Sequence, residues 1–379
     1  MSASPNDFLG TVTAAFLGQW PGTDPVEAAK VSLGLFSAPH LPSLAALPAR
    51  GGGSDAVGRT AALLQELPVD VQPYGWRFAD RPGLDHRRAV SALSTDINVL
   101  ADVAGAAGVV PDGVKAHITG PLSLAAAIHL HYGERALRDH GARRDIAQSL
   151  AAGLAVHAQK LQAAVPGSAL TLQIDEPHVA AIVAGTIPTA SGYRTLRSIP
   201  ASELRQTWSA LAEAAREAGF ANVAINLGPA ETGLGGTGGP GAGSPGTASG
   251  DLSDTASAEA AAWRKALEIA LESGADAVAV PLNRLDTGHW ELLAGAIEAG
   301  LGVWAGTVPA SAGRVPPSYS VLEERIMRPW RGLGLDASLL NQLRITPESS
   351  LAGLSPQEAR AVVSRALEVA ERLSEIRYL

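Results

Sequence analysis

The amino-acid sequence predicts an α/β fold, a (β/α)8 TIM barrel that spans residues 1–379 as a single domain. Short apolar or β-branched runs alternate along the chain with longer amphipathic stretches, which is the order expected of a parallel sheet covered by helices. Eight such runs occur, the strand number of this barrel. No G-x-G-x-x-G motif follows any of them, so an open, doubly wound sheet is only the second choice.

The elements follow from these patterns in chain order. The predicted strands are residues 12–17, 69–72, 114–118, 170–174, 222–225, 277–280, 302–306 and 343–346. The predicted helices, where apolar residues recur every three or four positions, are residues 25–35, 145–164, 201–218, 258–272 and 356–376. The first helix also carries a start signal, because Asp24 suits the cap and Pro25 the first helical position.

Two stretches interrupt the alternation. Residues 38–55 form a Pro/Gly-rich connection, and residues 228–257 contain ten glycines and three prolines. The second stretch buries too little apolar surface to offset the entropy of ordering it, so it is predicted to be a flexible loop insertion. Because it follows a strand, we expect residues 231–253 to be mobile and to lie over the barrel mouth.

Composition narrows the class of protein and of partner. Apolar residues make up 46% of the chain and charged residues 17%, as in ordinary globular proteins. A net charge of −8, with no long Lys/Arg run, argues against nucleic acid or a membrane surface as partner and favours a small neutral or zwitterionic ligand. The start of the chain lacks a basic signal-peptide region and no long apolar span occurs, which predicts a cytoplasmic protein. Nothing in the sequence indicates the oligomeric state.

The stretch "QIDEPHV" places two carboxylates at the end of a predicted strand. Neighbouring residues of a strand point to opposite sides, so one carboxylate can face the mouth while the other lies over the helix layer. We expect Asp175 to face the mouth, where it could hold an ammonium group. Glu176, next to Pro177, is expected to sit near the start of the following helix as its cap.

Three further residues are candidates for substrate binding. His117 in "HITGPLSLAAA" ends a predicted strand, although a hydrogen-bonded structural histidine is the commoner role at such a position. Gln19 and Trp20 in "LGQWPGTDP" follow the first strand, and capping of the next helix does not account for them. Both are expected at the mouth.

Four stretches together resemble the cobalamin-independent methionine synthase family, the 5-methyltetrahydropteroyltriglutamate–homocysteine S-methyltransferases, which are related to the uroporphyrinogen decarboxylase barrels. They are "LGQWPGTDP", "HITGPLSLA", "LQIDEPHV" and "ITPESSLAGLSPQEA", and they span nearly the whole chain in the family's order. The resemblance implies a single barrel like the family's C-terminal domain, which acts in methionine biosynthesis. It also implies that Asp175 holds the amino group of a homocysteine-like substrate.

The family binds the homocysteine thiolate on zinc, and here the implied ligand positions are Asn226, Gly228, Pro281 and Ser349 or Ser350. An amide, a glycine, a proline and a hydroxyl do not make a zinc site of the nitrogen and sulfur type, and the chain has no cysteine. We therefore expect a degenerate zinc site and predict no cofactor, while a methylated folate stays possible as co-substrate.

Three functions are compatible with this sequence. The first is a methyltransferase-family enzyme acting on a homocysteine-like amino acid, and the second is a non-catalytic binding or regulatory homologue. The third is a cofactor-free decarboxylase-like enzyme, favoured only by the basic residues near the predicted mouth, Arg77, Arg81, Arg194 and Arg197.

Overall fold

The computed structural model describes residues 10–228 and 249–376, with the side chains of 249–253 left aside. Within these ranges, seven strands form one parallel sheet in the order β1-β9-β8-β7-β6-β5-β4, and β2 and β3 form a separate antiparallel pair. The strands are β1 (Thr13–Ala14), β2 (Val69–Gln72), β3 (Gly75–Phe78), β4 (Gly113–Thr119), β5 (Ala169–Asp175), β6 (Asn222–Asn226), β7 (Ala277–Pro281), β8 (Gly302–Val308) and β9 (Leu343–Pro347).

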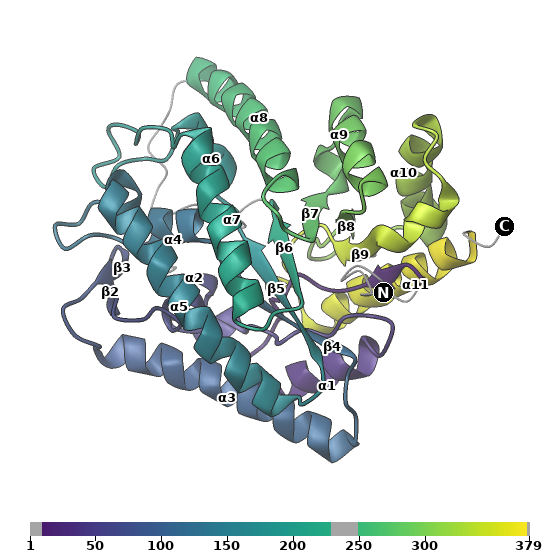
Figure 1. Ribbon diagram of the computed structural model, residues 1–379, viewed down its shortest axis with the longest axis horizontal. Coiled ribbons are helices and arrows are strands. Elements are labelled where there is room, and N and C mark those ends of the chain that lie inside the picture. The colour runs from purple at the N-terminus through teal and green to yellow at the C-terminus, as the bar shows by residue number, and fades with distance from the viewer. Residues whose placement is uncertain (1–9, 229–248, 377–379) are drawn as a thin grey trace.

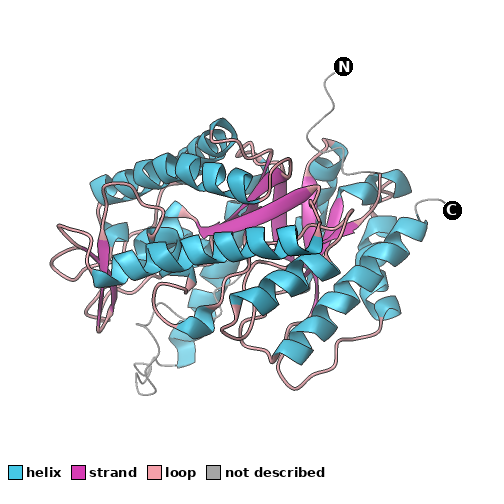
Figure 2. Cartoon of the chain, turned by 90° about the horizontal axis from the view of Figure 1, so that it is seen from below, coloured by secondary structure: helices cyan, strands magenta, loops and turns pink. Residues whose placement is uncertain are grey.

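The helices cover the outside of this curled sheet (Figure 1). They are α1 (Pro25–Leu35), α2 (Ala56–Ala61), α3 (Leu84–Ala107), α4 (Pro121–Ala127), α5 (His140–Ala164), α6 (Val179–Ala184), α7 (Ala201–Glu217), α8 (Ser249–Leu271), α9 (Thr287–Glu298), α10 (Tyr319–Gly332) and α11 (Pro356–Ile376). Short 3-10 turns occur at η1 (Pro48–Arg50), η2 (Ala136–Arg138), η3 (Leu282–Arg284) and η4 (Ala337–Gln342). Figure 2 shows the long helices lying along the strands from a second side.

The sequence predicted a closed barrel of eight regular strands, and the structure differs from this prediction in strand number and closure. The chain is a mixed α/β protein with a seven-stranded parallel sheet curled like part of a TIM barrel. Residues 69–72 do form a strand, but β2 pairs with β3 across the tight turn before Gly75, whose φ of 126° favours glycine. This hairpin lies outside the main sheet.

Residues 41–46 span the interval between the two outer strands, β1 and β4. The Leu41 amide donates to the Ala14 carbonyl at 3.0 Å, and the Leu44 amide donates to the Lys115 carbonyl at 2.8 Å. Isolated parallel bridges join Ser43 to Lys115 and Gln19 to Ala46. Because Pro42 has no amide hydrogen, the segment makes separate bridges instead of a regular ladder.

Alternation along the strands divides the core into two layers. One set of strand side chains packs outward against the helices, for example Val114, Leu172 and Ile345. The opposite set faces the inside of the curl, where a small apolar cluster holds Ala224, Ala279 and Trp304. The inward positions of β4, β5 and β9 carry polar side chains, and those of β4 and β5 contribute to the candidate site.

Several sequence predictions can be compared directly with the helices. Residues 25–35 and 356–376 are helical over the predicted ranges, as α1 and α11. In α1 the Asp24 side chain accepts from the Val26 amide at 2.8 Å, as the capping signal indicated. The predicted mobile stretch 231–253 lies outside the described residues up to 248, and residues 249–253 belong to α8.

None of the helices in the described ranges is long and apolar enough to cross a membrane. The described ends of the chain lie together, since the Thr11 hydroxyl donates to the Ser374 hydroxyl at 2.7 Å. The bond joins residues that are 363 positions apart in the sequence.

Candidate functional site

Asp175 is the last residue of β5 and lies on the inner side of the sheet, as alternation predicted. Its Oδ1 atom accepts from the Gln173 Nε2 atom at 2.6 Å and from the Asn226 Nδ2 atom at 2.7 Å. No hydrogen bond within the described part of the chain reaches its Oδ2 atom, and the side chain keeps partial solvent contact. One oxygen is thus fixed by two amides while the other is available.

A buried lysine lies at the far end of the same hydrogen-bonded chain. Lys115, on the inner side of β4, donates from Nζ to the Gln173 Oε1 atom at 2.7 Å and is fully buried. Its ammonium also lies 5.8 Å from the ring centre of Phe16 and 5.7 Å from that of Trp304, distances typical of cation–π contacts. Gln173 therefore links the cation of Lys115 to the carboxylate of Asp175.

Burial changes the proton affinities of both charged groups in opposite directions. It raises the pKa of Asp175 to about 6, although the amides of Asn226 and Gln173 and the charge of Lys115 pull it down. It lowers the pKa of Lys115 to about 7, with the charge of Asp175 acting against this shift. The two groups stabilise each other's charged forms across Gln173. Asp175 would gain most from a further cation close to its available oxygen.

Asn226 fixes the end of the next strand. While its amide nitrogen donates to Asp175, its Oδ1 atom accepts from the Gly228 amide at 2.9 Å. Both functional atoms of this side chain are therefore engaged. The family resemblance implies only that Asn226 is a lost zinc ligand, whereas the structure places it as a partner of Asp175.

Glu176 points to the other side of the sheet and is completely buried. Its carboxylate accepts from the Leu122 and Ser123 amides, at 3.3 and 2.8 Å, and from the Trp208 indole at 3.1 Å. It caps a helix as expected, but the helix is α4 of the neighbouring strand–helix unit and not α6, which follows it. The sequence predicted that Glu176 caps the helix after Pro177. In the folded chain the N-terminus of α4 lies beside the end of β5, and its amides donate to Glu176 instead. Burial raises the pKa of Glu176, and the hydrogen bonds oppose this shift.

His117 lies on the inner side of β4 with its ring packed against the backbone of Gly18. A Cβ atom added to Gly18 would lie 2.2 Å from the His117 Nδ1 atom, so only glycine fits there. His117 is buried, and neither ring nitrogen has a hydrogen-bond partner within the described residues. Burial, together with nearby positive charge, holds its pKa well below the usual range, so the ring is neutral. The hydrogen-bonded structural histidine considered from the sequence is not what the structure contains.

Gln19 and Trp20 have different surroundings. Gln19 is partly exposed and accepts from the Ser350 hydroxyl at 2.8 Å, which joins the ends of β1 and β9. Trp20 is buried, with its ring edge-on to Phe16 at 5.6 Å between ring centres. The expected position of Trp20 at the mouth is therefore wrong, because the indole packs into the outer core.

The implied zinc positions supply no metal-binding set. Asn226 is engaged with Asp175, Gly228 has no side chain, and Pro281 ends β7. Within the described residues, no group of three or more His, Asp or Glu side chains is arranged to hold a metal ion. The donors present at these positions do not fit zinc, and no step of the chemistry is assigned to a metal.

The basic residues of the decarboxylase alternative do not converge on Asp175. Arg77 lies on β3 and pairs with Asp70 at 3.7 Å. Arg81, Arg194 and Arg197 are exposed side chains in the loops after β3 and α6.

Sequence reasoning missed Lys115 and Gln173 as partners of the site. A signal was present, because the predicted strand "VKAHI" carries a lysine within an apolar run, and charged side chains are rarely buried without a partner. Gln173 and Asp175 also lie two residues apart, on the same face of one strand.

No family model matches the chain, and no curated protein matches it. Among solved structures, it is similar to a methyltransferase from Methanosarcina mazei, with 10% identity, coverage of 94% of each chain and a TM-score of 0.48. A protein described as a lyase/mutase from Burkholderia cenocepacia J2315 matches with 14% identity, 96% of this chain and 84% of that chain, and a TM-score of 0.39. A morphinone reductase variant matches with 12% identity, 89% and 82% coverage, and a TM-score of 0.39. At these values the likeness assigns no family, substrate or reaction, and membership of the methionine synthase family stays a prediction.

Proposed function

We propose that the chain is a methionine-synthase-like protein that binds a small amino acid of the homocysteine type at the carboxyl ends of β5 and β6. Asp175 holds the ammonium group of this ligand through its Oδ2 atom. The observation that carries the proposal is the geometry of Asp175, whose Oδ1 atom is held by two amide donors while Oδ2 is available. The sequence resemblance supplies the class of amino acid.

The electrostatics of the site support a cationic ligand group. The pKa of Asp175 is raised to about 6 mainly by burial, so ionisation of this carboxyl is unfavourable before a ligand arrives. An ammonium beside Oδ2 would stabilise the ionised form and lower this pKa. A charge-assisted hydrogen bond of this kind contributes on the order of 1.5–3 kcal/mol.

The pH dependence of binding follows from the same shift. Below pH 6 the unliganded carboxyl is largely protonated, so a ligand ammonium must displace that proton before it can bind. Affinity should therefore fall by up to about tenfold for each pH unit below 6 and be nearly constant just above it.

Calorimetric titration with L-homocysteine and L-methionine at pH 5 and pH 7.5 tests the proposal. Asp175→Asn should weaken binding at pH 7.5 by roughly tenfold or more and remove most of the difference between the two pH values. The des-amino analogue 4-mercaptobutanoate should bind weakly to the parent chain. Equal binding of homocysteine and this analogue would rule out an ammonium contact with Asp175.

Glu176→Gln serves as the matched control, because Glu176 is the adjacent carboxylate and faces the helix layer. It should leave ligand affinity within about twofold of the parent while lowering the free energy of unfolding by about 1–3 kcal/mol, since glutamine has one acceptor oxygen where the buried carboxylate uses both. If Glu176→Gln weakens the ligand as strongly as Asp175→Asn, the effect comes from the fold and not from the contact.

A further inference from the structure

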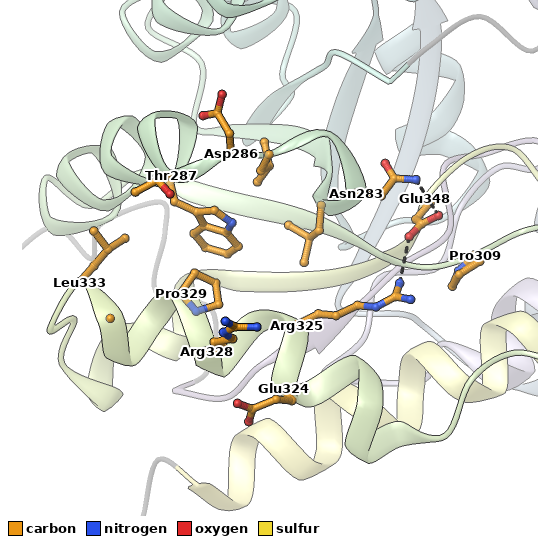
Figure 3. A pocket seen from close by; sticks show the side chains of 14 residues that line it. Asn283, Asp286, Thr287, Pro309, Glu324, Arg325, Arg328, Pro329, Leu333 and Glu348 are labelled. Carbon is orange, nitrogen blue, oxygen red and sulfur yellow. Dashed lines mark hydrogen bonds and ion pairs between the residues drawn. The ribbon is translucent and has the colours of Figure 1, made fainter.

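A cavity lies between α9 and α10, away from Asp175. It has a volume of about 840 Å3, which is within the range of small-molecule sites. Its lining side chains come from η3, the start of α9, α10 and the loops after β8 and β9 (Figure 3). No residue of β4, β5 or β6 contributes to it, so this groove is separate from the candidate site.

Both α9 and α10 contact β8, but they do not pack closely on each other, and this leaves the groove open. In contrast, α10 and α11 do pack on each other. Short residues face the space at two positions, Thr287 at the start of α9 and Gly332 at the end of α10. A Cβ atom built on Gly332 has no neighbour within 4 Å. The remaining apolar lining consists of Leu282, Leu285, Trp290, Pro309, Pro329 and Leu333.

The charges around the groove leave a positive site on the α10 side. Arg325 and Arg328 both line the cavity from α10. Arg325 pairs with Glu348 at 3.3 Å, shown by a dashed line in Figure 3, whereas Arg328 is exposed and makes no ion pair within the described residues. An exposed guanidinium beside apolar walls suits a carboxylate, sulfonate or phosphate group.

The three acidic residues of the lining have partners other than Arg328. The Asp286 carboxylate caps α9 by accepting from the His289 amide at 2.9 Å, and Glu324 pairs with Arg331 at 3.4 Å. In Figure 3 the Asp286 carboxylate lies above the other lining side chains and the Glu324 carboxylate lies below them. Glu348 is held by Arg325 and by the Asn283 amide at 3.1 Å.

We propose that the groove between α9 and α10 binds a small, largely apolar molecule that carries one acidic group. The apolar body lies against Trp290, Leu285 and Leu333, and the acidic group binds Arg328. This site does not depend on the function proposed for Asp175.

Anilinonaphthalene sulfonate is a suitable probe, because it joins an aromatic body to one sulfonate. Its uncharged analogue N-phenylnaphthylamine separates the contribution of charge from that of apolar contact. Fluorescence titration of the folded chain should give a single saturable site for the anionic probe. Arg328→Gln should weaken the anionic probe by roughly tenfold and the uncharged analogue by less than about twofold.

Gly332→Leu adds a larger side chain at a lining position of the groove, on a helical residue without positive φ whose Cβ meets no neighbour within 4 Å. It should weaken binding of both probes. Gly295→Leu, at an exposed position of α9 that also has open space, is the control for the size of the substitution, and Arg88→Gln on α3 is the control for lost surface charge. Both controls should bind as the parent does.

Two results would overturn the proposal. One is undiminished binding by Gly332→Leu with an unfolding temperature equal to that of Gly295→Leu, since the probe would then bind elsewhere. The other is equal weakening of both probes by Arg328→Gln, since a lost ion pair should affect only the anion. Arg328 is exposed, so this variant gives a result even if Gly332→Leu fails to fold.

Discussion

The inside of the curled sheet and the groove between α9 and α10 differ in how their side chains are satisfied. Inside the sheet, Lys115 and Gln173 are fully buried and joined by hydrogen bonds to Asp175. The groove has about 840 Å3 of volume, mostly apolar walls, and in Arg328 an exposed cation at its edge. Buried charges need fixed partners, whereas an exposed guanidinium is satisfied by water until a ligand comes. The comparison teaches that the buried charges of this molecule are held by fixed hydrogen-bond partners, whereas the charge of Arg328 beside the groove faces solvent.

The largest expected difference between the two regions is in their tolerance of substitution. Lys115→Ala should lower the free energy of unfolding by about 3–5 kcal/mol, because it leaves a cavity and takes the positive partner away from a buried carboxylate. Lys115→Met, which keeps most of the volume, should cost clearly less. Urea denaturation of the three proteins measures this. If Lys115→Ala and Lys115→Met lower the free energy of unfolding equally, the lost charge, and not the lost packing, dominates the effect.

A pH-dependent difference is expected next in size. The pKa of Asp175 is raised in the folded chain to about 6, above its value of 3.8 when unfolded, so ionisation costs stability. The parent should therefore lose stability relative to Asp175→Asn as the pH rises from about 4 to about 6, by roughly 1–3 kcal/mol, and show little further change just above that.

Denaturant unfolding of the parent and Asp175→Asn at pH 4, 5, 6 and 7 checks the sign and the range. If the difference in the free energy of unfolding between the two proteins stays constant over this range, Asp175 does not titrate there. If the parent instead gains stability relative to Asp175→Asn as the pH rises, the carboxylate is better stabilised in the folded chain than in the unfolded chain.

The smallest expected effect is in the groove. Gly332→Ala should raise the free energy of unfolding by about 0.5 kcal/mol, because alanine favours the helix and the added methyl group meets open space. Thermal unfolding beside the parent measures it. A destabilisation of similar size would indicate that α10 must bend or fray at this residue, which would weaken the comparison with the rigid interior.

The parts of the fold that local signals determine could be predicted from the sequence. The α1 helix has a cap and a proline at its start, and α11 has regular apolar spacing, so both were predicted over their observed ranges. The 24-residue helix α3 was not among the predicted ranges, and neither were the shorter helices α2, α9 and α10. Residues 41–46 were interpreted as a connection, because their hydrogen bonds are to strands distant in sequence and no local pattern specifies them.

The candidate site shows the same difference between features set by local sequence and features set by contacts between distant residues. That Asp175 faces inward follows from strand alternation within one short stretch. That Glu176 caps α4 depends on how two strand–helix units lie beside each other, since Ser123 and Glu176 are 53 positions apart in the sequence. Contacts across units are set by the assembled sheet, so a single sequence could not reveal them.

The pairing of β1 has a consequence for the order of events during synthesis. Its ladder partner is β9, and the buried bond from Arg344 to Thr13 joins residues 331 positions apart. At ribosomal rates of about 5–20 residues per second, β1 waits roughly 20 to 70 s for this partner. During that time one edge of the strand can be occupied only by residues 41–46, which follow within seconds. The short bridging segment can thus protect a nascent strand from pairing with other chains long before the sheet is complete.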